Sequence, residues 1–93
     1  MNIVFSPEAE ADLQAGLDYL RERNPAVAIK LAEQVFAALE LLASGEVDGP
    51  EHRLTTGEVV RSWLVLPYRL FYQRTENELR VLRLYHRARR PIT

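Results

Sequence analysis

The fold is decided by a short link between two helical patterns, Leu20-Arg21-Glu22-Arg23-Asn24-Pro25 (LRERNP). Asn24 is a strong helix N-cap, and Pro25 suits the first position of a helix, where no backbone N–H is needed. A second helix is therefore expected to begin at Pro25, directly after a first helix ends at about Arg23. A link this short turns the second helix back along the first, so the pair is predicted to form a helical hairpin.

Both helices can be followed outward from this link. Towards the N-terminus, Ser6-Pro7-Glu8 repeats the start signal of a cap, a proline and an acidic first turn. Within the first helix, leucines recur at helical spacing at Leu13, Leu17 and Leu20. The second helix has a wider apolar stripe and is expected to end before Gly45, a residue suited to the C′ position. Each helix has one apolar face, so the pair must pack on another layer.

The remainder of the chain supplies that layer, because its pattern changes to that of β-strands. A short apolar stretch of β character, Asn2–Phe5, precedes the first helix, and residues 46–57 have the composition of a polar loop. Three further strands are expected at Val59–Leu66, Tyr68–Arg74 and Leu79–Tyr85. The breaks between them are short, which favours antiparallel neighbours. We predict one α+β domain over residues 1–93 with the order β-α-α-β-β-β, a helical hairpin packed on a small antiparallel sheet. The pattern leaves open which face of the sheet meets the helices.

The composition argues against several kinds of site. The chain has no cysteine, so neither disulfides nor thiolate chemistry is expected. Its two histidines, His52 and His86, do not stand at a known ligand spacing, and we expect no metal and no other cofactor. No apolar run approaches the roughly 20 residues of a membrane span, and the N-terminus lacks the pattern of a signal peptide. We therefore expect a cytoplasmic protein without a membrane partner.

Charge is divided between the two halves of the chain. Residues 1–50 carry nine acidic and three basic side chains, whereas residues 51–93 carry four acidic side chains and nine arginines. Arginine is a rigid bidentate donor for carboxylates and phosphates, so the second half is suited to an acidic partner. Arg87, Arg89 and Arg90 could contact such a partner, but three arginines are equally typical of a solvated chain end. The candidate residues for binding a partner or target are Arg61, Arg83, Arg87, Arg89 and Arg90, with the apolar Ile29 and Phe36 of the second helix.

Three sequence motifs stand in order along the chain: Phe5–Leu13 (FSPEAEADL), Tyr68–Tyr72 (YRLFY) and Leu79–Pro91 (LRVLRLYHRARRP). Together with the element order, they resemble the ParE-like branch of the RelE/ParE superfamily, the toxins of type II toxin–antitoxin modules that include plasmid stabilisation systems. The resemblance spans essentially the whole chain. It implies a toxin that is neutralised by a cognate antitoxin, ParD-like and with a ribbon-helix-helix part.

The resemblance leaves the target of the toxin open, because ParE-like members act on DNA gyrase and RelE-like members cleave mRNA on the ribosome. RelE-like nucleases generally supply lysines from the sheet, but no lysine follows Lys30 here. A YoeB-like variant would use Arg69, His86, a stacking Tyr85 and a glutamate, Glu58 or Glu51. All of these residues also fit ordinary sheet positions, so we assign no catalytic residue. We predict a toxin that binds and inhibits gyrase and makes no specific DNA contact itself. The alternatives are a ribosome-dependent mRNA endonuclease and an inactivated toxin retained as a regulatory partner.

Overall fold

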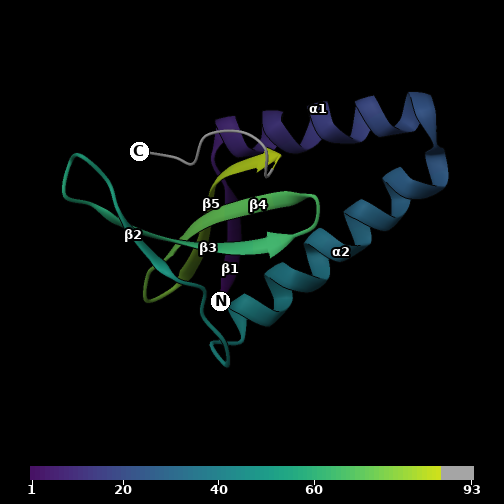
Figure 1. The fold of residues 1–93 in the computed structure, drawn as a ribbon. Coiled ribbons are helices and arrows are strands. Elements are labelled where there is room, and N and C mark those ends of the chain that lie inside the picture. The colour runs from purple at the N-terminus through teal and green to yellow at the C-terminus, as the bar shows by residue number, and fades with distance from the viewer. Residues whose placement is uncertain (87–93) are drawn as a thin grey trace.

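The computed structural model describes residues 1–86, so the predicted contacts of Arg87, Arg89 and Arg90 lie outside the described residues. Within this range the elements are β1 (Asn2–Phe5), α1 (Pro7–Arg23), α2 (Pro25–Ala43), β2 (Glu51–Arg53), β3 (Val59–Val65), β4 (Tyr68–Arg74) and β5 (Glu78–His86). They form two layers, a helical hairpin and a five-stranded sheet with the order β1-β5-β4-β3-β2 (Figure 1). The predicted α+β fold is confirmed.

The hairpin forms where the capping residues indicate it. Ser6 Oγ accepts a hydrogen bond from the Ala9 N–H at 3.0 Å and so caps α1. Asn24 serves both helices. Its backbone N–H donates to the Leu20 carbonyl at 2.6 Å, and its side chain accepts from the Val27 N–H at 3.4 Å. One residue therefore ends α1 and begins α2, which satisfies exposed groups of both helices and keeps the link short.

The sheet combines antiparallel pairs with one parallel pair. β3, β4 and β5 pair in antiparallel order, as expected. β1 adds to the other side of β5 in parallel, so that β5 lies between β1 and β4. Ser6 Oγ also donates to the Leu82 carbonyl at 2.8 Å. This hydrogen bond fastens the start of α1 to β5 at the point where β1 ends.

One short strand was not predicted. β2 lies within residues 46–57 and pairs with the start of β3, so the prediction of an uninterrupted loop is wrong at this point. Its three residues, Glu51-His52-Arg53, are polar and have low strand propensity, and the pairing depends instead on their position beside β3. The turn between β2 and β3 contains Gly57 at φ +89°, a left-handed conformation that glycine adopts without strain.

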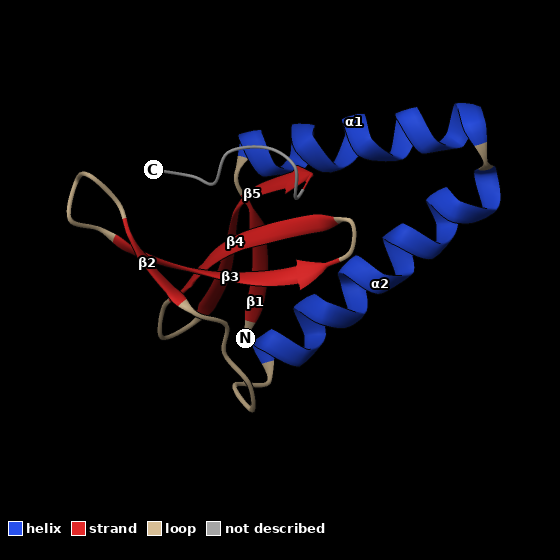
Figure 2. Cartoon of the chain, in the orientation of Figure 1, coloured by secondary structure: helices blue, strands red, loops and turns tan. Residues whose placement is uncertain are grey.

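The helical hairpin covers one face of the sheet, which answers the question that the sequence left open (Figure 2). Trp63 and Val65 of β3 pack on the helix side, whereas Leu64 between them points away and is 50% exposed. The core between helices and sheet consists of Ala9, Leu31, Val35, Leu39, Leu42, Val65, Leu70, Tyr72, Leu79, Val81 and Leu84. In the described part of the chain no helix lies on the opposite face, which we call the open face (Figure 2). From β3, β4 and β5 it presents Ser62, Leu64, Arg69, Phe71, Arg83 and Tyr85.

Candidate functional site

Side chains of the open face stand in cross-strand rows. In one row, Arg69 of β4 has Leu64 of β3 and Tyr85 of β5 as its register partners. The neighbouring row places Phe71 between Ser62 and Arg83. Side chains directly opposite one another in a sheet are close enough to interact. The open face therefore gathers two arginines and two aromatic rings over the middle strands.

Ring contacts fix the centre of this face. Phe71 is fully buried, and its ring centroid lies 5.8 Å from that of His52 and 5.9 Å from that of Tyr85, both in edge-to-face geometry. The Arg83 guanidinium lies 4.5 Å from the centroid of the Tyr85 ring. His52 Nε2 and Ser62 Oγ are 2.8 Å apart and share a hydrogen bond. Each ring at the centre of the face therefore has a defined neighbour.

Arg83 is held by α1. Its Nε donates to Asp12 Oδ2 at 2.8 Å, and its Nη2 donates to Asp12 Oδ1 at 3.1 Å. The Leu84 N–H donates to the same carboxylate at 3.0 Å. The hydrogen bond from Arg83 to Asp12 raises the pKa of the guanidinium above its ordinary value, although desolvation acts in the opposite direction. The predicted binding residue Arg83 is therefore paired with Asp12 within the protein, and this ion pair joins α1 to β5.

Arg61 and the two candidate glutamates also have partners within the protein. Arg61 donates to the Gly49 carbonyl and to the Glu51 carboxylate, each at 2.8 Å. Glu58 lies just before β3 and accepts a hydrogen bond from Gln73 Nε2 at 2.7 Å. These contacts join β3 to the residues before β2 and to β4. Arg61, Glu51 and Glu58 are therefore each hydrogen-bonded within the protein.

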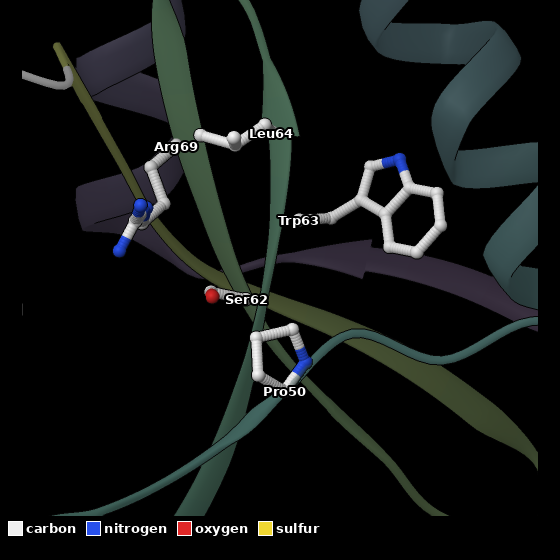
Figure 3. Close-up of a pocket in the computed structure, with 5 residues that line it drawn as sticks. All are labelled: Pro50, Ser62, Trp63, Leu64 and Arg69. Carbon is white, nitrogen blue, oxygen red and sulfur yellow. The ribbon is translucent and has the colours of Figure 1, made fainter.

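Arg69 differs from every other arginine in residues 1–86. The others each have a hydrogen bond, an ion pair or a ring contact, whereas Arg69 has none. Its side chain lines a groove of about 360 Å³ on the outer side of β3, together with Pro50, Ser62, Trp63 and Leu64. Figure 3 shows the Arg69 guanidinium on the same side of the strand as Leu64 and Ser62, and Trp63 on the other. The groove therefore contains one available cation.

His86 lies on the opposite face of the sheet from Arg69 and Tyr85. Tyr85 and His86 are consecutive in β5, and successive side chains of a strand point to opposite faces. The ring centroid of His86 is 5.6 Å from that of Tyr68 on the helix side, and both residues line a groove of about 410 Å³ with Tyr19 of α1. Burial raises the pKa of Tyr68. The structure thus brings Arg69 and Tyr85 together and leaves His86 apart from them.

Ile29 and Phe36 lie seven residues apart on one flank of α2, and they are 62% and 51% exposed. Seven residues are about two helical turns, so the two side chains are aligned along the helix. Phe36 lines a third groove, of about 380 Å³, with Phe5 and Leu13. This apolar flank lies away from Arg83 on the open face. Strand alternation places Arg61 on the same side of β3 as Trp63, so the described binding candidates do not share one surface.

Residues 3–91 match the family described as ParE toxin of type II toxin–antitoxin system, parDE. The chain belongs to the ParE toxin family. Its fold is shared by the chromosomal ParDE TA system from P. aeruginosa, with a TM-score of 0.71, 20% sequence identity and coverage of 92% of this chain and 95% of that chain. It is also shared by the YoeB dimer from Staphylococcus aureus, with a TM-score of 0.60, 20% identity and coverage of 91% and 94%. A comparison with curated proteins found no match. The predicted resemblance is confirmed, and the chain is the toxin of a type II toxin–antitoxin system.

One polar cluster of this ParE-family toxin was not predicted. Arg74 donates to Asp48 and to the Leu42 carbonyl at the end of α2, each at 2.6 Å. The Tyr72 hydroxyl donates to Asp48 at 3.1 Å and accepts from the Gly49 N–H at 2.9 Å. Burial opposes ionisation of Asp48, but the hydrogen bonds from Arg74 and Tyr72 outweigh it and hold the pKa of the carboxyl below 3.8. The cluster fastens the loop after α2 to β4. No local pattern predicts it, because Asp48 and Arg74 are 26 residues apart.

Residues 1–86 contain no group of three or more histidine, aspartate and glutamate side chains that could hold a metal ion. Neither helix in that range is long and apolar enough to cross a membrane. The candidate site consists of two surfaces: the open face with its groove at Arg69, and the apolar flank of α2.

Proposed function

We propose that this ParE-family toxin acts in the cytoplasm by binding and inhibiting DNA gyrase, without a catalytic step of its own. The observation that carries this proposal is the position of His86, which lies across the sheet from Arg69 and Tyr85. An mRNA nuclease needs an acid or base and a cation at the same phosphate. An inhibitor that acts by binding needs an ordered surface with charge complementary to its partner. The open face, with its fixed rings and one unpaired arginine, fits the second requirement.

The proposal includes a cognate antitoxin, ParD-like and with a ribbon-helix-helix part. The exposed flank of α2 at Ile29 and Phe36 supports it, because an amphipathic segment that folds on binding can cover such an apolar flank. Co-purification with the product of the neighbouring gene tests the pair. Phe36→Asp should release the antitoxin, and Leu41→Asp is the matched control, since Leu41 is an exposed apolar residue on another side of α2. Equal retention by both variants would contradict this placement.

Two assays on the purified chain test the target. We expect inhibition of gyrase supercoiling and no codon-phased cleavage of mRNA in a translating extract. His86→Gln keeps size and polarity but removes the titrating ring, and growth arrest should survive it. Replacing Arg87, Arg89 and Arg90 together should weaken growth arrest, since each charge-assisted contact contributes about 1.5–3 kcal/mol at most. Unimpaired supercoiling, with mRNA cleavage that is lost in His86→Gln, would instead identify the ribosome-dependent endonuclease.

A further inference from the structure

The outer edge of β3 is open over its second half. β2 pairs only with Val59–Arg61, and beyond that the Ser62 N–H donates to the Pro50 carbonyl at 3.1 Å. Main-chain groups of a strand alternate in direction, so the Leu64 N–H points to the same side as that of Ser62, past the end of β2. Among residues 1–86, none accepts a hydrogen bond from the Leu64 N–H on that side. An unpaired edge of this kind is a site at which an extended segment can add as a strand.

The groove beside this edge is positively charged. Arg69 is the one charged residue among its described lining residues, and among residues 1–86 it has no hydrogen-bond or ion-pair partner. Adjacent strands lie about 4.8 Å apart, a distance that a long arginine side chain can span, so the guanidinium on β4 can reach past β3 towards an added strand. A planar guanidinium with free donors matches a carboxylate, which it can hold by two parallel hydrogen bonds.

The rest of the groove is apolar. Leu64 is half exposed at its rim, and Pro50 and Trp63 complete the lining with little polar surface apart from the Ser62 hydroxyl. Ser62 is itself buried and hydrogen-bonded to His52. A partner therefore has to supply an apolar side chain to this part of the groove, next to the carboxylate that Arg69 accommodates.

We propose that the groove at the edge of β3 binds an extended segment of the toxin's protein target. The segment adds to β3 as a strand, places an aspartate or glutamate against Arg69 and seats an apolar side chain between Pro50 and Leu64. This inference rests on the proposed function, because it takes the target to be DNA gyrase. It assigns target binding to the open face, and it separates that surface from the apolar flank of α2.

Binding of the purified toxin to purified gyrase, measured by interferometry, tests the role of Arg69. Arg69→Gln should weaken binding about 10- to 100-fold, as expected for loss of a hydrogen-bonded charge pair. Arg69→Lys should recover part of this loss, because lysine keeps the charge but lacks the fork. Arg80→Gln is the matched control: Arg80 is an exposed arginine of β5 outside the groove, and its removal should leave affinity unchanged.

The outcomes separate the two proposals. A wild-type chain that fails to bind gyrase contradicts the proposed function, and this inference falls with it. A wild-type chain that binds, with Arg69→Gln binding equally well, contradicts this inference alone. Thermal melting followed by circular dichroism checks that Arg69→Gln is folded. We expect an unchanged melting curve, because Arg69 makes no hydrogen bond or ion pair among residues 1–86.

Photo-cross-linking identifies the segment directly. A photoreactive amino acid at position 64 should cross-link to a gyrase peptide that contains an acidic residue and a neighbouring apolar one. The same group at position 36, on the flank of α2, should not cross-link to gyrase. Cross-linking of position 64 to a peptide without acidic residues, or only to a co-expressed antitoxin, would overturn the inference.

Discussion

On the helix-covered face of the sheet, Leu70 and Val81 are fully buried against a cluster of apolar side chains that includes Leu39 of α2. On the open face, Phe71 is buried just as completely, but the rings of His52 and Tyr85 enclose it. The first face is held together by non-directional burial, and the second by contacts that require particular geometry. Burial of apolar area stabilises the fold, whereas ordered rings and charges prepare a surface for recognition. The two faces should therefore respond differently to substitution.

Leu39→Ala should have the largest effect. Leu39 is fully buried, so truncation leaves a cavity and should lower the free energy of unfolding by about 2–5 kcal/mol. Leu64→Ala is the control on the open face, where a half-exposed side chain should cost less than about 0.5 kcal/mol. Urea unfolding of both variants measures the difference. Similar midpoints would mean that the helix-covered face does not carry the stability assigned to it.

Asp12→Ala should have the next largest effect, because Asp12 joins α1 to β5. The substitution leaves the Arg83 guanidinium and the Leu84 N–H without their acceptor, which should cost about 1–3 kcal/mol. Asp12→Asn retains one acceptor oxygen and should lose less. Urea unfolding again provides the measurement. If Asp12→Ala is as stable as the wild type, this contact does not hold the edge of the open face in place.

Asp48 should make stability depend on acid pH. Its folded-state pKa lies below the ordinary value of 3.8, so its contribution is present above that value and is lost as pH falls through the folded pKa. The difference in unfolding free energy between wild type and Asp48→Asn should therefore be constant above about pH 5 and shrink below pH 4. An amplitude below about 1 kcal/mol is expected, since the pair with Arg74 is partly exposed. A difference that is independent of pH would contradict this assignment.

Arg69→Gln should have the smallest effect on stability, less than about 0.5 kcal/mol, because within the described part of the chain Arg69 has no hydrogen bond or ion pair to lose. Arg61→Gln is the informative comparison, since it removes hydrogen bonds to Gly49 and Glu51. Thermal denaturation should place Arg69→Gln at the wild-type midpoint and Arg61→Gln below it. A clear destabilisation by Arg69→Gln would indicate that Arg69 supports the fold and is not held available for a partner.

Local signals in the sequence predicted most of the fold. The caps at Ser6 and Asn24 act within three residues of their partners, so both helices begin where the pattern indicates. The strand Tyr68–Arg74 was predicted with its observed bounds. The parallel pairing of β1 was not predicted, because its partner β5 is distant along the chain. β2 was not predicted although it pairs with the nearby β3, because its three residues are polar and carry no strand pattern of their own.

The candidate site could be predicted only in part. Arg69 and Tyr85 were identified from the resemblance. That Arg69 has no acidic partner among residues 1–86 could not be predicted, because it depends on the position of each acidic side chain in the folded protein. The separation of His86 from Tyr85 could have been inferred, because adjacent residues of one strand point to opposite faces. Nothing in the sequence indicated that Arg83 would form an ion pair with Asp12, since 71 residues separate them.

The position of β5 has a consequence for the order in which the chain is made. β5 is the last described strand to be synthesised, yet it lies between β1 and β4. While a ribosome is translating the residues before Glu78, β1 has no strand to pair with, and Ser6 and Asp12 of the first helix have no β5 to hold. Translation that stops before Glu78 therefore yields a fragment that lacks the strand between β1 and β4 and lacks Tyr85 of the open face. The open face with Tyr85 can therefore form only after β5, the last described strand, has been made.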